Sequence, residues 1–120
     1  MLYTIEKEQI DYIPHRSDYD RWKRRLTDEE YNQIKAEIRK RIIGKEVNVA
    51  SWIPGSNWGG TAFQCIYEKA CRSDYASSAM FFGLIVWEVM IEHEDNWAFI
   101  KYNREDDSSI RSMVYFRINL

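Results

Sequence analysis

The stretch MFFGLIVWEVMIE, Met80 to Glu92, decides the fold, because apolar side chains are densest there. In an extended conformation both of its faces are apolar. One face would carry Phe81, Ile85, Trp87, Val89 and Ile91, and the other Phe82, Leu84, Val86 and Met90, with Glu88 and Glu92. Such a strand lies in the centre of a sheet or is covered on its second face. The β-branched residues Ile85, Val86 and Val89 favour a strand. A helix over Tyr75 to Val86 is the alternative, since periodicity does not separate the two in so short a run.

The segments that follow predict a three-stranded antiparallel meander. HEDN, His93 to Asn96, is typical of a hairpin turn. Trp97 to Asn103 is then the return strand, and the polar stretch Arg104 to Ser109 is a loop. Met113 to Leu120 is the last strand, whose core-facing residues are predicted to be Val114, Phe116, Ile118 and Leu120.

Helices dominate the N-terminal half. A short helix is expected at about Asp18 to Arg25, and its buried side would carry Tyr19, Trp22 and Leu26. Thr27 and Glu30 form a capping box that begins a second helix, and Gly44 occupies the position of a C-terminal cap. The apolar stripe of this second helix consists of Tyr31, Ile34, Ile38 and Ile42.

Two further strands and a helix complete the predicted fold. Leu2 to Ile5 is expected as an edge strand, and Glu46 to Ile53 as a strand whose inner face holds Val47, Val49 and Ile53. Thr61 and Gln64 predict a capping box for a helix that ends near Arg72. Residues 1–120 are therefore expected to form one α+β domain, in which helices pack on one face of a mainly antiparallel sheet.

The composition indicates a globular protein. The 120 residues are 45% hydrophobic and 30% charged, and the aromatic share of 15% suggests a pocket or an interface. The net charge of −2 gives no general attraction to nucleic acid. Cys65 and Cys71 cannot bridge each other within one helix, and no leader is apparent, which favours the cytoplasm. The apolar run Ala79 to Trp87 is too short to span a bilayer.

The loop SWIPGSNWGGTAFQC, Ser51 to Cys65, is the main candidate site. Gly59 and Gly60 would let a ligand approach the backbone just before a helix N-terminus at Thr61. Aromatic walls are expected from Trp52, Trp58 and Phe63, and further walls from Trp97 and Tyr102. The loop matches no phosphate-binding pattern. The alternative is a structural turn whose rings pack on the core.

Cys65 and His93 form a second candidate site. A thiol in the first turn of a helix can have a lowered pKa, and a histidine on a following strand could act as its base, with Asp95 or Asn96 orienting the ring. This arrangement predicts a thiol-dependent hydrolase or transferase. The alternative is a packed cysteine and a solvated imidazole.

Charged clusters give weaker signals. Glu88, Glu92, Glu94 and Asp95 lie near His93, but no second histidine or cysteine has ligand spacing, so we expect no metal and no cofactor. The basic segment RWKRR, Arg21 to Arg25, could contact phosphates and stack a base on Trp22. Carboxylates flank it on both sides, which is more typical of a salt-bridged helix surface, so we do not expect nucleic acid as a partner.

The sequence as a whole favours a non-enzymatic binding domain with an aromatic-lined pocket for a small molecule or a segment of a partner protein. A homodimer is also expected, because the second apolar strand face needs a cover and the strand Met113 to Leu120 offers an edge. The alternatives are the thiol enzyme and an interaction protein of the inhibitor or immunity type, whose acidic patches would bind a basic enzyme.

Overall fold

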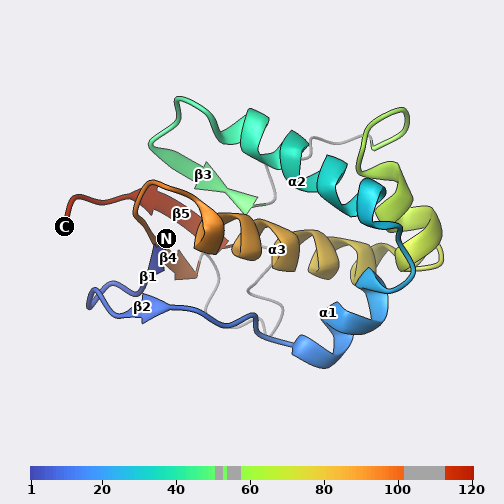
Figure 1. The fold of residues 1–120 in the computed structure, drawn as a ribbon, viewed down its shortest axis with the longest axis horizontal. Coiled ribbons are helices and arrows are strands. Elements are labelled where there is room, and N and C mark those ends of the chain that lie inside the picture. The colour runs from blue at the N-terminus through green and yellow to red at the C-terminus, as the bar shows by residue number, and fades with distance from the viewer. Residues whose placement is uncertain (51–52, 54–57, 102–112) are drawn as a thin grey trace.

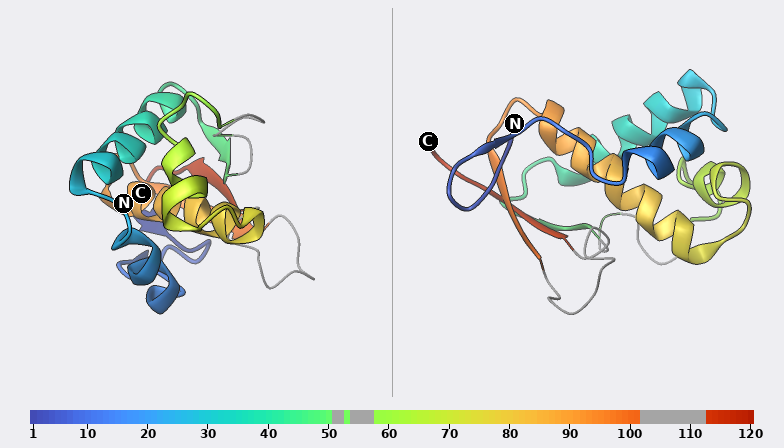
Figure 2. Two further views of the ribbon diagram at one scale, coloured as in Figure 1. Left: turned by 90° about the vertical axis from the view of Figure 1, so that its right-hand side faces the viewer. Right: turned by 90° about the horizontal axis from the view of Figure 1, so that it is seen from below.

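Five strands form one sheet, and the helices lie on one side of it (Figures 1 and 2). The computed structural model of the protein describes residues 1–50, 53, 58–101 and 113–120. In chain order its elements are β1 (Leu2–Tyr3), β2 (Gln9–Ile10), α1 (Arg16–Lys23), α2 (Asp28–Ile42), β3 (Val47–Val49), the π-helix η2 (Ile66–Ala70), α3 (Tyr75–Glu92), β4 (Trp97–Lys101) and β5 (Met113–Arg117). This is an α+β fold, as the sequence predicts.

The stretch Met80 to Glu92 belongs to α3, so the prediction of a strand there is wrong and the helical alternative holds. Asp74 caps the helix, because its carboxylate accepts the main-chain N–H groups of Ala76 and Ser77 at 3.0 and 3.4 Å. The sheet covers one side of α3, and α1, α2 and η2 pack against the others. A helix enclosed in this way is apolar nearly all round, and Glu88 and Glu92 give its second half only a short polar side. Its sequence therefore resembles that of a buried strand.

The strand order across the sheet is β2-β1-β4-β5-β3, and β1 runs parallel to β4 while the other neighbours are antiparallel. β1 lies between β2 and β4, so it is not the predicted edge strand. β5 lies between β4 and β3 and offers no free edge for a dimer. His93 to Asn96 joins α3 to β4 and does not close a hairpin. The antiparallel neighbours β4, β5 and β3 take the place of the predicted meander.

The inner face of the sheet, which faces α3, does not carry the residues that the sequence assigns to it. In β5 the core-facing residues are Met113 and Tyr115, whereas Val114 and Phe116 point outward and remain partly exposed. In β3 Val47 is 54% exposed, and Asn48 is the buried residue. The predicted facings of Val47, Val114 and Phe116 are therefore wrong, whereas Ile53, which the sequence also assigns to the core, is buried beyond the end of β3. β5 is apolar at alternate positions on both sides, so alternation alone does not choose its inner face.

The prediction for α2 is confirmed in detail. The Thr27 hydroxyl accepts the Glu30 N–H at 3.1 Å, and the Glu30 carboxylate accepts the Thr27 N–H at 2.9 Å. Gly44 follows the helix with a φ of +77°, a conformation that glycine adopts without strain. The predicted stripe is buried: Tyr31, Ile34, Ile38 and Ile42. The predicted inner side of α1 is buried too: Tyr19, Trp22 and Leu26.

The segment after the aromatic loop is less regular than a capping box predicts. The Thr61 hydroxyl accepts the Phe63 N–H at 3.2 Å, and the Gln64 side chain accepts the Gly60 N–H at 3.0 Å. These contacts are shifted from the expected pairing of Thr61 with Gln64. The chain then forms the single π-helical turn η2, which ends before the predicted limit at Arg72.

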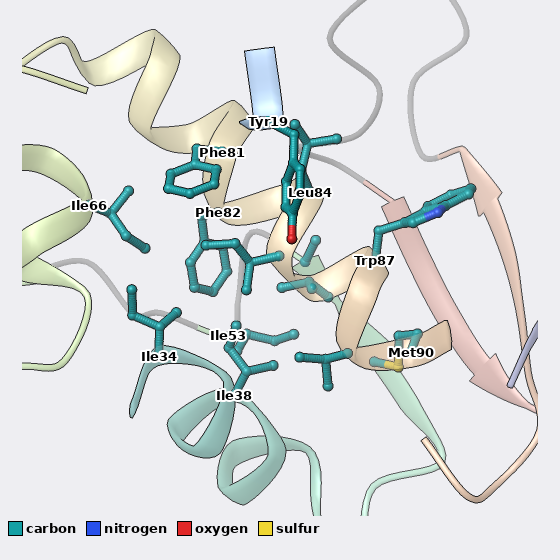
Figure 3. Packing of buried hydrophobic residues seen from close by; sticks show 14 of the residues in the cluster. Tyr19, Ile34, Ile38, Ile53, Ile66, Phe81, Phe82, Leu84, Trp87 and Met90 are labelled. Atoms are coloured by element: carbon teal, nitrogen blue, oxygen red, sulfur yellow. The ribbon is translucent and has the colours of Figure 1, made fainter. Parts of the chain in front are cut away.

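One hydrophobic cluster joins the helices to the sheet, and Figure 3 shows α3 at its centre with Ile34 and Ile38 of α2 on one side and Tyr19 of α1 on another. By length and composition α3 could also cross a membrane, but more than half of it is buried inside the protein. A buried apolar helix of this kind is compatible with a soluble domain.

Candidate functional site

The described rings of the predicted aromatic site, Trp58 and Phe63, pack on each other and on α3. Trp58 is half-buried and packs on Phe82 of α3, with ring centroids 5.7 Å apart. Phe63 packs edge-to-face on Phe82 at 5.0 Å and is fully buried. Phe63 is therefore a core side chain, as the alternative of a structural turn with rings packed on the core predicts. Of the described aromatic side chains in this loop, Trp58 remains partly exposed to solvent.

The main-chain groups of the loop have partners within the protein. The Gly60 N–H donates to the Gln64 side chain at 3.0 Å, and the Thr61 N–H donates to the Trp58 carbonyl at 3.1 Å. Gly60 has a φ of +74°, which suits glycine, while Gly59 precedes it at the surface. The amides of Gly60 and Thr61 make the turn itself and do not serve as anchors for a ligand.

The remaining predicted walls do not join this loop. Trp97 is 1% exposed and packs edge-to-face on His93, which follows the last residue of α3. Phe82, which contacts Trp58, lies eleven residues before His93, or about 16 Å along the helix axis at 1.5 Å per residue. Trp97 is thus a core residue at the opposite end of α3. Trp52 and Tyr102 lie outside the described residues.

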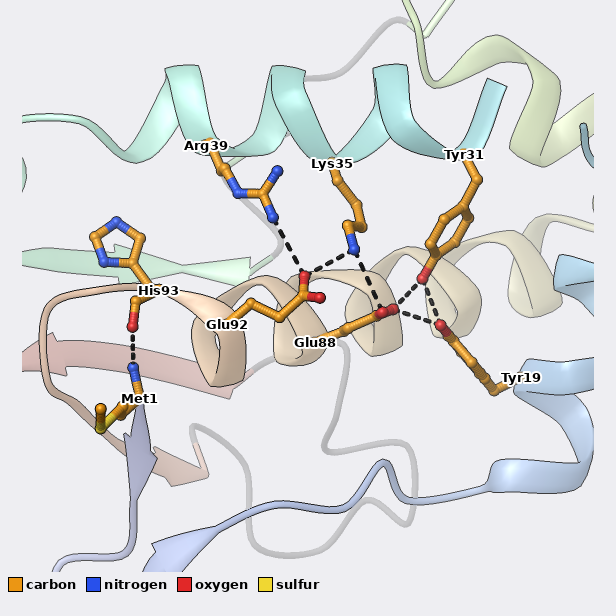
Figure 4. A network of polar contacts seen from close by, with 8 residues as sticks. All are labelled: Met1, Tyr19, Tyr31, Lys35, Arg39, Glu88, Glu92 and His93. Carbon is orange, nitrogen blue, oxygen red and sulfur yellow. Dashed lines mark hydrogen bonds and ion pairs between the residues drawn. The ribbon is translucent and has the colours of Figure 1, made fainter. Parts of the chain in front are cut away.

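Cys65 and His93 are not brought together. Cys65 precedes η2 at the N-terminal end of α3, and its thiol contacts the Ala62 carbonyl at 3.4 Å. His93 follows the C-terminal end of α3 (Figures 1 and 4). Burial, and then the nearby charge of Glu30, raise the pKa of the Cys65 thiol above its usual value. A raised pKa is the reverse of what a reactive thiolate needs.

His93 has a structural environment. Its Nδ1 accepts the Asp95 N–H at 3.0 Å, and its ring stands edge-on to Trp97. The Met1 amine donates to the His93 carbonyl and, at 2.8 Å, to the Asp95 carbonyl. Burial lowers the pKa of His93, and the Met1 amine and Arg117 act in the same direction, while Asp95 and Glu94 oppose them.

We expect the protein to lose stability as the pH falls below about 6.5, the ordinary pKa of histidine. The unfolded chain then binds a proton that the folded His93 accepts only at lower pH, so stability falls until the pH reaches the lowered folded pKa. Urea unfolding between about pH 7.5 and pH 5 measures this slope. The His93→Gln variant is expected to lose the His93 component of the slope. If the pH dependence of stability is unchanged in that variant, groups other than His93 cause it.

The predicted acidic cluster is part of a polar network that links α1, α2 and α3 (Figure 4). Glu88 accepts hydrogen bonds from the hydroxyls of Tyr19 and Tyr31, which lie 2.6 Å from each other. The Lys35 ammonium lies 3.5 Å from Glu88 and 2.7 Å from Glu92. Among the described residues, no three His, Cys, Asp or Glu side chains gather to hold a metal ion.

The charges of this network are balanced internally. Burial by itself would raise the pKa of Glu88, but hydrogen bonds from Tyr19 and Tyr31 and the charges of Lys35 and Lys23 outweigh it, so the pKa is lowered. Arg39 pairs with Glu92 at 3.2 Å. The carboxylates of Glu88 and Glu92 are therefore committed to the fold and do not form a free acidic patch. Tyr19, Tyr31 and Lys35 were not singled out from the sequence as partners of Glu88, although Tyr31 and Lys35 are four residues apart on one helix.

The basic segment has local partners as well. Arg21 pairs with Asp18 at 2.8 Å, Arg25 donates to the Ala70 carbonyl at 2.7 Å, and Trp22 is 5% exposed. A buried indole cannot stack on a base. A polar hollow of about 710 Å³ opens at this corner, lined by Ser17, Asp20, Lys23, Arg24, Leu26 and Asp28. Its mixed charges select no particular class of ligand.

The outer face of the sheet is the feature that most resembles a binding surface. Its described side chains are Tyr3, Gln9, Val47, Ala98, Ile100, Val114 and Phe116. Val47 and Ile100 are 54% and 42% exposed, Ala98 is 2% exposed, and the set contains no charged side chain. An antiparallel sheet usually presents polar residues on a face that it leaves to solvent. The residues of this face were present in the sequence, but those of β5 were assigned to the core.

A comparison of the chain with protein-family models, with curated proteins and with solved structures finds no match.

Proposed function

We propose that the protein is a non-enzymatic, cytoplasmic binding domain that pairs with a second copy of itself through the outer face of its sheet. The observation that carries this proposal is the exposure of apolar, uncharged side chains on that face. The centres of protein interfaces are depleted of charged residues in the same way. The described helices all lie on the other side of the sheet and leave this face to a partner.

The size and shape of the face favour a second copy. The strands have two, two, three, five and five residues, which at about 3.4 Å per residue and about 4.8 Å between strands give a face of about 280 Å² in projection. A standard interface buries about 800 Å² per partner, so a weak and reversible dimer is expected. Sheets pack face to face, and a twofold axis sets the same uncharged surface against itself. A net charge of −2 adds little repulsion between two copies.

The Val47→Lys variant is expected to weaken the dimer by about tenfold or more, because it places an ammonium group against apolar surface. Val47 is half-exposed on an edge strand, where lysine is well tolerated in the folded monomer. Sedimentation equilibrium from about 1 µM to about 1 mM gives the dissociation constants. Ile43→Lys is the matched control, since Ile43 is 74% exposed but follows α2 and belongs to no strand of the sheet.

The proposal fails if wild type stays monomeric over this range or if both variants dimerise as wild type does. A monomeric wild type that binds another protein in a Val47-dependent manner would assign the same face to a different partner. The thiol enzyme is not favoured, because Cys65 and His93 lie at opposite ends of α3. The inhibitor-type alternative is not favoured either, because Lys35 and Arg39 already neutralise Glu92.

A further inference from the structure

The inner face of the sheet carries polar atoms that have no partner among the residues that the structure describes. Asn48 Nδ2, Trp97 Nε1 and Tyr115 OH are buried and have no hydrogen-bond partner among the described residues. Their residues are 3%, 1% and 0% exposed. Buried polar groups of this kind are rare in folded proteins, and a bound water molecule is a common reason for them.

Two of these groups come from residues that are directly opposite each other. Asn48 of β3 pairs with Tyr115 of β5 in the antiparallel ladder. The Arg117 N–H donates to the Glu46 carbonyl, so Glu46 and Arg117 form a hydrogen-bonded pair. Every second pair of opposite residues in an antiparallel ladder is hydrogen-bonded, so Asn48 and Tyr115, two residues further on, form such a pair as well. Their main chains then satisfy each other, with Cα atoms about 5.5 Å apart, and both side chains project toward α3. Only the side-chain groups remain without partners.

The third group lies close by. Trp97 is opposite Arg117, so it is diagonal to Tyr115 across the β4–β5 pair, a separation of about 7–8 Å between Cα atoms. An indole N–H only donates, an amide nitrogen only donates, and a phenol hydroxyl both donates and accepts. A buried water typically makes about three hydrogen bonds. These groups are suited to a ligand whose oxygen accepts hydrogen bonds from the N–H donors and which can itself donate a hydrogen bond to the Tyr115 oxygen.

We propose that one ordered water molecule is bound between Asn48 Nδ2 and Tyr115 OH, where it ties the edge strand β3 to β5 beneath α3. The water accepts the Asn48 N–H and donates to the Tyr115 oxygen, and the Trp97 N–H is the nearest further donor. This hydration site gives a reason for an asparagine at the core-facing position 48 of β3. It is independent of any dimer, because it lies on the opposite face of the sheet.

A double-mutant cycle tests the proposal. Tyr115→Phe and Asn48→Val are each expected to raise the equilibrium constant for unfolding by about tenfold, because each leaves the water short of a partner. The double variant is expected to show clearly less than the product of the two changes, since both act through one water molecule. Urea unfolding of the four proteins gives the coupling, and the cycle cancels the higher strand propensity of valine.

The control is Tyr75→Phe, which removes a hydroxyl from a residue that is 78% exposed and is expected to change nothing. Two outcomes overturn the proposal. In the first, both single variants become more stable, as expected if no water is bound to the two groups. In the second, the change in the unfolding constant of the double variant equals the product of the two single changes. A high-resolution crystal structure gives an independent readout. Density for a water within hydrogen-bond distance of both side chains supports the site, and a protein atom bonded to Asn48 Nδ2 in its place overturns it.

Discussion

Truncation of Phe63 to alanine is expected to lower the free energy of unfolding by about 3–5 kcal/mol. The ring is fully buried and packs edge-to-face on Phe82 at 5.0 Å, and the Arg41 guanidinium lies 4.9 Å from its centroid. Its removal costs the transfer free energy of the ring and leaves a cavity between the aromatic loop and α3. Chemical denaturation measures the loss.

Two variants calibrate this result. Phe63→Leu retains most of the apolar volume and is expected to lose less than half as much stability. Tyr67→Ala changes an aromatic residue four positions on that is 38% exposed, and its effect should stay near 0.5 kcal/mol. A small effect of Phe63→Ala would contradict a packed core at this position and return Phe63 to the list of pocket walls.

The second large effect is expected at Glu88, where substitution by alanine should cost about 3 kcal/mol. The loss leaves the buried hydroxyls of Tyr19 and Tyr31 without their shared acceptor, and it removes one carboxylate from Lys35, whose side chain is only 12% exposed. The helices α1, α2 and α3 meet at this carboxylate, so its loss should destabilise the whole fold. The shift in the midpoint of urea unfolding measures the lost free energy of unfolding.

Glu92→Ala is the matched control, one turn further along the same helix. Its carboxylate pairs with Lys35 and Arg39 but is 41% exposed, so its removal should cost about 1 kcal/mol or less. Equal losses for the two variants would mean that the tyrosine hydrogen bonds contribute little, and that the network is an ordinary surface cluster of charges.

Local signals in the sequence were sufficient for α2. A capping box, a stripe at helical spacing and a terminal glycine agree on one element, and each of them acts between near neighbours in the chain. The α+β class was also predictable, because most elements were assigned to the correct type.

The assignment of α3 failed for a physical reason. The sheet and the other helices enclose this helix, so selection for burial acts on all of its sides and erases the polar stripe that identifies a surface helix. β-branched residues such as Ile85, Val86 and Val89 are tolerated there because tertiary packing outweighs weak intrinsic propensity. The sequence pattern does not decide which face of β5 is inward either, since Tyr115 and Phe116 are both apolar enough to face the core.

The candidate sites depended on distances through space, which the sequence does not contain. Trp58, Phe63 and Trp97 are rings that suit either a pocket or a core, and Phe63 and Trp97 belong to the core. Cys65 and His93 have the residue types of a catalytic pair, but an 18-residue helix separates their positions. The outer face became recognisable only when the register of β4 and β5 placed Ile100 opposite Val114.

The parallel pairing of β1 with β4 imposes an order on folding. Leu2 must find Trp97, and Val47 must find Phe116, so the sheet closes only after the two ends of the chain have met. α1 contacts α2, and η2 contacts α3, between segments that are neighbours in the chain, whereas α1 and α2 reach α3 across long stretches of the chain. Closing long loops costs entropy before any strand pair repays it. The strand pairs β1–β4 and β3–β5, which join residues far apart in the chain, are therefore expected to form after the closer pair β4–β5.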